Sequence, residues 1–193
     1  MKKILISGAG GIGGVNFVRA LKIFKNKFFI VGLDFNKYYL EFPDVDVRIN
    51  SPRHSDPNFI KLLHELIEKH KIDFLHPHPS SEALVVSQNI DSIKTKTLLP
   101  KPNIISTDKL KTQKILSDSG INVAQTKIFE NLNSIQTSFE ELGGGPLWIR
   151  AKSGAGGNLS LLCSEPKEVE YWMKLWILRG KANIDDFMLQ QFL

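Results

Sequence analysis

The chain has 193 residues, of which 42% are hydrophobic and 23% charged, and its formal net charge is +5. This composition is that of a globular protein and excludes a disordered chain, a collagen and a coiled coil, while basic residues scattered without aromatic neighbours indicate no nucleic-acid partner. No apolar run approaches the roughly 20 residues of a membrane helix, and no secretory apolar segment precedes the first glycines, so we expect a cytoplasmic protein without a membrane partner.

The first hundred residues alternate between short apolar strands and helices. Strands are expected at 3–7, 28–33, 73–75 and 97–99. Helices are expected after the first glycine cluster, from Asp56-Pro57, and from Ser80. One face of the first helix is predicted from apolar residues that recur every three positions: Ile12, Val15, Val18, Leu21 and Phe24. The alternation predicts an α/β domain over 1–106, with a Rossmann-like parallel sheet wrapped by helices on both sides.

The pattern changes near 104–107, where we place a domain boundary. A lysine-rich helix is expected from Asp108 to Asp118, ending at Gly120. Strands are then predicted at 125–129, 146–151, 159–163 and 187–193, and helices near 134–142 and 166–179. This order predicts a small α+β domain over 107–193. Because its last strand stops at the chain end, we expect this domain to be truncated.

A glycine motif lies between the first strand and the first helix. The run from Gly8 to Gly13 fits G-x-G-x-x-G, in which absent side chains let the backbone approach a phosphate at the helix N-terminus. Asp34 follows 21 residues after Gly13, where a dinucleotide-binding fold places the acid that holds the ribose. The motif therefore predicts an NAD-binding Rossmann domain of an oxidoreductase, or else glycines that only permit a tight strand-to-helix turn.

A second glycine-rich segment lies in the second half of the chain. The apolar strand Pro146 to Arg150 ends in a cation and is followed by a loop, from Ala151 to Gly157, that contains three glycines. Such a loop can fold over the phosphates of a nucleotide while the strand-borne cation reaches an oxygen. A flexible hairpin with an incidental arginine is the alternative. The second half has no Tyr-x-x-x-Lys pair or Ser-His arrangement, which disfavours hydride transfer.

Two histidines flank a proline where a predicted strand ends. His76 and His78 lie at the edge of the sheet where α/β proteins bind ligands. A metal site needs a third ligand, which the sequence does not identify, so we favour ordinary loop histidines.

Taken together, these segments resemble the N-terminal part of an ATP-grasp protein, most closely the large chain of carbamoyl phosphate synthase. The resemblance implies a preATP-grasp domain over 1–106, followed over 107–193 by an incomplete N-terminal ATP-grasp subdomain that forms the nucleotide lid. The matching segments run through nearly the whole chain: Lys3 to Leu21, Ile30 to Asp34, Asp73 to Pro77 with Glu82, Asp108-Lys109, Ser119 to Ile121, Pro146 to Gly157, and Met188 to Phe192.

The resemblance also implies roles for individual residues. The ATP-binding residues would be Lys109, Arg150, Lys152, Gly154, Gly156, Gly157, Gln190, Gln191 and Phe192. Lys109 and Arg150 would approach phosphates, the three glycines would form the lid, and the last three residues would line the adenine pocket. The residues on the substrate side would be Gly8, Gly10, Gly11 and Glu82. The family's Mg²⁺ ligands are expected beyond Leu193, and no catalytic residue is assigned.

The implied function is the ATP-binding portion of a carboxylate–amine or carbamoyl phosphate synthase-like ligase. In that family MgATP phosphorylates a carboxylate, and an amine or similar nucleophile attacks the acyl phosphate. The expected partners are small-molecule carboxylate and amine substrates, and a second chain or a homodimer. We expect the isolated chain to be inactive. An NAD-binding oxidoreductase domain, and a non-catalytic subunit completed by a separate chain, remain the alternatives.

Overall fold

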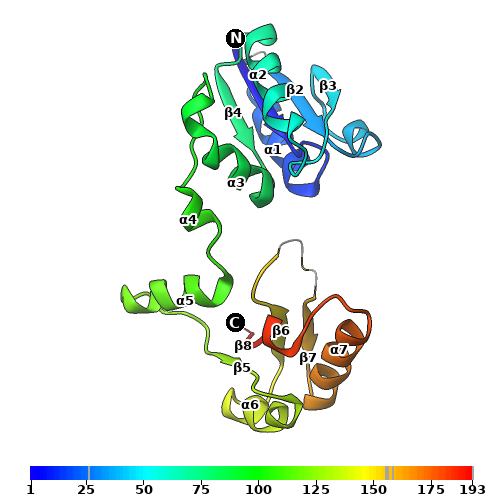
Figure 1. Cartoon of the computed structure of the whole chain (residues 1–193), viewed down its shortest axis with the longest axis vertical. Coiled ribbons are helices and arrows are strands. Elements are labelled where there is room, and N and C mark those ends of the chain that lie inside the picture. The colour runs from blue at the N-terminus through cyan, green and yellow to red at the C-terminus, as the bar shows by residue number, and fades with distance from the viewer. Residues whose placement is uncertain (26, 155–156, 158, 193) are drawn as a thin grey trace. The chain divides into compact units, whose positions relative to one another are not determined.

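The computed structural model describes residues 1–25, 27–154, 157 and 159–192. The chain divides into two compact units, Met1–Ser106 and Thr107–Leu193 (Figure 1). Each unit has its own four-stranded sheet and its own apolar core, so each is described by itself. Among the described helices, none is both long enough and apolar enough to span a bilayer.

The first unit is a parallel sheet with helices on both faces. Its strands are β1 (Lys2–Ser7), β2 (Phe28–Asp34), β3 (Val47–Asn50) and β4 (Phe74–Pro77). Its helices are α1 (Ile12–Lys22), α2 (Asn58–His70), α3 (Ser80–Gln88) and α4 (Pro102–Ile105), with 3₁₀ turns η1 (Tyr39–Glu41) and η2 (Ile90–Ser92). The strand order β3-β2-β1-β4, with every pair parallel, confirms the α/β prediction.

Side-chain alternation along β1 and β2 divides the core of this unit into two layers. Leu5 and Val31 point to one face and pack with Leu63 of α2 and its neighbours. Ile4, Ile6 and Ile30 point to the other face and pack against Val18 of α1. Both faces of a parallel sheet need helical cover, which explains why these strands are almost uninterrupted apolar runs.

The predicted buried face of α1 is only partly correct. Val15 and Val18 are buried, whereas Ile12 is 86% exposed and Phe24, which lies beyond the helix, is 54% exposed. A helix turns about 100° per residue, so a step of three residues falls about 60° short of a full turn. The row of apolar residues therefore winds around the helix, and only its middle faces the sheet.

Two strand predictions in this unit also need correction. The segment 97–99 is not a strand, and only its neighbour Lys96 forms a single bridge with Phe74. Conversely, β3 was not predicted, because its four residues are too few to show a clear period. Its pairing with β2, which places Val31 beside Val47, is a tertiary contact rather than a local preference.

The second unit is an antiparallel sheet with the strand order β5-β8-β6-β7. Its strands are β5 (Thr126–Ile128), β6 (Leu147–Ala151), β7 (Leu161–Cys163) and β8 (Phe187–Gln191). Its helices are α5 (Lys109–Asp118), α6 (Ile135–Glu141) and α7 (Pro166–Leu178), with 3₁₀ turns η3 (Leu132–Ser134) and η4 (Ile184–Asp186). These elements confirm the mixed α/β class predicted for the chain.

One face of this sheet packs against α6 and α7, and the residues between them form the core of the unit. Leu147, Ile149 and Leu189 pack there against Phe139 of α6 and Met173 of α7, and all five are at most 2% exposed. The alternate positions of the same strands therefore point to the opposite face of the sheet. That opposite face carries the polar side chains of the candidate site.

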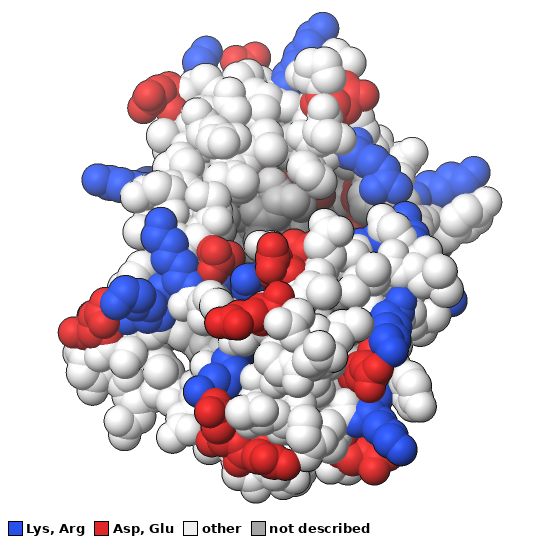
Figure 2. Space-filling model, turned by 60° about the horizontal axis from the view of Figure 1, so that its bottom comes forward, with Lys and Arg blue, Asp and Glu red and all other residues white. Residues whose placement is uncertain are grey.

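Charged side chains of both signs are mixed on the surface. Figure 2 shows basic and acidic residues beside one another on the face in view. Lys114 pairs with Asp118 at 3.0 Å along α5, and Lys2 pairs with Asp73 at 3.0 Å. Such exposed pairs add little stability, but they show that several lysines form ion pairs with nearby acidic residues.

Candidate nucleotide-binding site

The first turn of α5 is anchored to the loop that follows β6. The Asp108 carboxylate caps α5 by accepting a hydrogen bond from the backbone N–H of Lys111 at 2.7 Å. The backbone N–H of Lys109 donates to the carbonyl of Lys152 at 2.9 Å, and its ammonium donates to the carbonyl of Gly154 at 2.7 Å. Lys109 is thus held beside the glycine loop by both its backbone and its side chain.

Arg150 places a second cation near Lys109. It lies on β6 and points away from the core, and its Nη1 donates to Oε1 of Gln190 on β8 at 3.2 Å. Its buried Nε has no hydrogen-bond partner among the described residues. Burial lowers the pKa of Lys109, the nearby Arg150 lowers it further, and Asp108 opposes both effects. Two close cations, one with an unused buried N–H, suit an anionic ligand.

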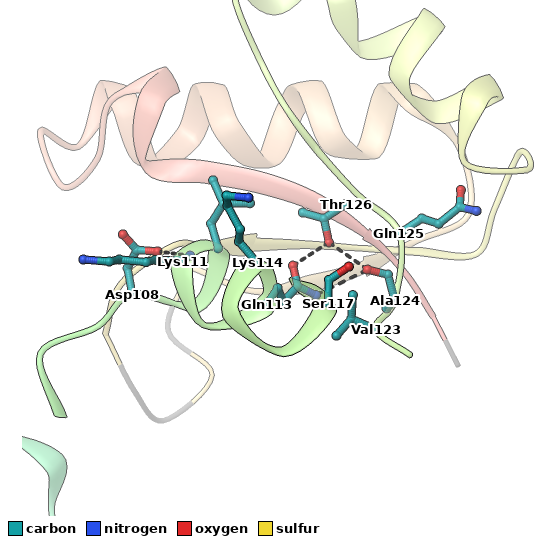
Figure 3. Close-up of a pocket in the computed structure, with 10 residues that line it drawn as sticks. Asp108, Lys111, Gln113, Lys114, Ser117, Val123, Ala124, Gln125 and Thr126 are labelled. Carbon is teal, nitrogen blue, oxygen red and sulfur yellow. Dashed lines mark hydrogen bonds between the residues drawn. The ribbon is translucent and has the colours of Figure 1, made fainter. Parts of the chain in front are cut away.

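A chain of side-chain hydrogen bonds connects Arg150 to α5. Gln190 accepts from Arg150 and donates through Nε2 to Oγ1 of Thr126 at 3.2 Å. The Thr126 hydroxyl donates to Oε1 of Gln113 at 2.8 Å, and Gln113 donates to the carbonyl of Ala124 at 3.3 Å (Figure 3). Thr126 and Gln113 were not predicted from the sequence, since only the pairing of β5 with β8 brings them to Gln190.

A cavity of about 670 Å³ adjoins this network. Figure 3 shows that α5 and the segment before β5 form its walls. Its lining residues are Asp108, Leu110, Lys111, Gln113, Lys114, Ser117, Val123, Ala124, Gln125 and Thr126. Because Gln113 and Thr126 belong to both, the cavity and the polar network share one boundary.

The glycine loop after β6 is partly described. Gly154 and Gly157 have φ angles of +90° and +72°, which side chains rarely adopt, and a Cβ at either would meet nothing within 4 Å. Gly156 lies outside the described residues. The Lys152 backbone donates to the carbonyl of Asp186 at 2.8 Å, while its ammonium forms no hydrogen bond or ion pair with a described residue. Lys152 is therefore a cation without the fixed partners of Arg150.

The three residues predicted for the adenine pocket do not share a face. Gln190 belongs to the hydrogen-bonded network of Arg150 and Thr126, and the ring of Phe192 lies 6.1 Å from that of Trp148 on the same side of the sheet. Gln191 alternates to the other side, where its Oε1 accepts from the backbone N–H of Gln125 at 3.3 Å. The structure thus brings Lys109, Arg150 and Gly154 together with Gln190, and separates the side chain of Gln191 from them.

In the first unit, Asp34 is directed at the protein's own loop. It is 4% exposed, and its two carboxylate oxygens accept from the backbone N–H groups of Gly10 at 3.1 Å and Asn36 at 2.9 Å. A Cβ at Gly10 would lie 2.6 Å from the backbone of Tyr39, whereas a Cβ at Gly11 would make only an ordinary contact, at 3.6 Å, with the carbonyl oxygen of Gly8. Tyr39 thus occupies the space beside Gly10, which disfavours an NAD pyrophosphate there.

Glu82 is a buried acid at the start of α3. It is 4% exposed, Ser7 beside it is fully buried, and neither Oε2 of Glu82 nor the Ser7 hydroxyl has a well-formed hydrogen bond among the described residues. Burial raises the pKa of Glu82 to about 7, the Ser7 hydroxyl opposes this rise, and the Asp34 carboxylate adds to it. Glu82 also lies against Gly8, whose added Cβ would be 3.6 Å from Oε2.

No protein-family model and no curated protein matches this sequence. Solved structures do match its fold over the full length of the chain. N5-carboxyaminoimidazole ribonucleotide synthetase from Thermotoga maritima is 20% identical, with a TM-score of 0.61 and 46% of its own length covered. The L-amino acid ligase of Bacillus licheniformis is 13% identical, with a TM-score of 0.62 and 44% covered.

A third match is the biotin carboxylase domain of the 2-oxoglutarate carboxylase from Hydrogenobacter thermophilus, which is 16% identical with a TM-score of 0.60 and 44% of its length covered. All three are ATP-grasp enzymes. The chain has an ATP-grasp fold. It spans less than half the length of these enzymes, and the predicted resemblance is confirmed at the level of the fold. The closer likeness to carbamoyl phosphate synthase stays a prediction.

Proposed function

We propose that this chain is the ATP-binding portion of an ATP-grasp ligase that joins a small carboxylate to an amine. In this reaction class ATP supplies the phosphate that activates the carboxylate as an acyl phosphate. The observation that carries the proposal is the pair of cations, Lys109 and Arg150, beside the Gly154 loop. The Hydrogenobacter biotin carboxylase domain was crystallised in complex with MgADP and bicarbonate, which supports the same class of ligand.

The residues of the second unit fit the phosphates of ATP. The buried N–H at Nε of Arg150 has no acceptor among the described residues, and the Lys109 ammonium donates to the carbonyl of Gly154. A phosphate oxygen would accept from both, with charge-assisted bonds stronger than the neutral ones. The space beside Gly154 and Gly157 is open, since a Cβ added at either would meet nothing within 4 Å. We assign the polar network ending at Gln190 and the ring of Phe192 to the base.

The described residues do not fit a protein-held magnesium ion. Among them, no group of three or more His, Cys, Asp or Glu side chains could hold a metal. We therefore assign no described residue to Mg²⁺, and we expect the chain to bind ATP without turning it over. The substrate-side assignment rests on Glu82 and Gly11, the latter beside a cavity of about 570 Å³ that also contacts Arg19 and Tyr39.

The test is ATP affinity measured by calorimetry on Arg150→Ala and on the matched control Lys152→Ala. Both variants remove one positive charge near the same loop, but only Arg150 is fixed by a strand and a hydrogen bond. We expect Arg150→Ala to weaken binding at least about tenfold, or about 1.4 kcal/mol, and Lys152→Ala to change it far less. Equal effects, or no ATP binding by the parent chain, would overturn the assignment.

A further inference from the structure

Two imidazoles meet at the carboxyl end of β4. His76 is in the strand and His78 follows it, so the two side chains point to the same side. Nε2 of His76 and Nδ1 of His78 lie 3.4 Å apart, and the ring centroids are 5.6 Å apart. Neither ring belongs to the nucleotide site, which lies in the other unit.

Helix α1 fixes both rings. The ring of Phe17 lies 4.2 Å from that of His76, with an angle of 31° between the planes. The His78 ring is seated against Gly13, where an added Cβ would be only 2.0 Å from Nε2. The backbone N–H of His78 also donates to the carbonyl of Ser7 at 3.1 Å. The separation of the two nitrogens is thus set by packing from a neighbouring helix and strand.

This separation matches a tetrahedral chelate. Two Zn–N bonds of about 2.05 Å at the tetrahedral angle put their nitrogens about 3.3 Å apart, whereas a square-planar pair would need about 2.9 Å. We propose that His76 and His78 bind Zn²⁺ through these two nitrogens, with water in the remaining positions. The described residues offer no third ligand of the His, Cys, Asp or Glu type, so two side chains alone would hold the ion, against the sequence-based preference for ordinary loop histidines. Such a site is exchangeable and is not a structural zinc.

The protonation states of the rings permit this binding. In the free protein one ring nitrogen donates to the other. The metal displaces this proton, which moves through solvent to the outer nitrogen of the same ring. Both rings then carry their single proton on the outer nitrogen, Nδ1 of His76 and Nε2 of His78, and no net proton is released.

The test is calorimetric titration of the chain with ZnCl₂ in the presence of millimolar MgCl₂. We expect one zinc site, with affinity reduced at least about tenfold in His78→Ala. His78 is exposed, so its truncation leaves the fold intact. The matched control is His54→Ala combined with His64→Ala, which removes two histidines that line a different cavity of the same unit. This control variant should bind zinc with the affinity of the parent chain.

A second variant tests the positioning by α1. Gly13→Ala should weaken zinc binding severalfold by displacing the His78 ring, while circular dichroism shows the helix retained. Co²⁺ in place of Zn²⁺ should give the strong visible absorption of a tetrahedral ion. Zinc binding that survives in His78→Ala, binding lost in the His54 and His64 control, or an octahedral Co²⁺ spectrum would each overturn the proposal.

Discussion

Replacing Glu82 by glutamine should change how the stability of the chain depends on pH. Burial raises the pKa of this carboxyl from 4.5 to about 7 in the folded protein. The folded state therefore holds the Glu82 proton more tightly than the unfolded state does. The resulting stabilisation is fully present below about pH 4.5 and is lost as the pH rises to about 7.

The size of the effect follows from the difference in pKa. Each tenfold change in the protonation equilibrium corresponds to about 1.4 kcal/mol, so the parent chain should lose about 3 kcal/mol across this range from Glu82 alone. Glu82→Gln has nearly the same shape and no charge, and so it lacks this loss. A buried amide without partners costs a fixed about 1 to 3 kcal/mol, which does not vary with pH.

The assay is urea denaturation of the parent and of Glu82→Gln at about pH 4.5, 6 and 8. Other titrating groups act equally in both proteins, so the difference between their free energies of unfolding isolates Glu82. We expect this difference to move in favour of the variant by about 3 kcal/mol between pH 4.5 and 8. Glu65→Gln, an exposed change on α2, should show no such movement. Parallel curves for Glu82→Gln and the parent would refute this reasoning.

Two further changes test the first unit. Asp34→Ala should cost about 3 kcal/mol in urea denaturation, because it removes the charged acceptor of the Gly10 and Asn36 N–H groups, and a loss below about 1 kcal/mol would contradict this role. Phe59→Ala should cost about 3 to 5 kcal/mol, since this ring is fully buried between α2 and the sheet, and a near-neutral effect would mean that α2 is packed differently.

The local signals in the sequence were sufficient for most elements of the fold. Continuous apolar runs such as Phe28–Asp34 predict buried parallel strands, because such strands are covered on both faces. Asp108 marks the start of α5 and Gly120, with a φ of +77°, follows its end, since capping chemistry is local. The order of these elements, together with the two glycine segments, was enough to predict the ATP-grasp fold.

Other features depended on contacts between distant residues. The short strand β3 exists through its pairing with β2, and the burial of Val15 but not of Ile12 depends on how α1 lies on the sheet. Asp34 has the position of a ribose-binding acid in the sequence, yet its oxygens hold the Gly10 loop. A spacing of 21 residues fixes where Asp34 lies along the chain, but not what its carboxylate faces.

The candidate site shows the same division. A strand-borne arginine before a glycine loop is visible in the sequence, so Arg150 and Gly154 were predicted from it, whereas the role of Lys109 was implied by the family resemblance. Their meeting, and the unused N–H of Arg150, follow only from the packing of α5 beside the loop after β6. Residue types and periods are properties of the local chain, whereas the partners of a polar atom are chosen by folding, because only folding brings distant groups within hydrogen-bond range.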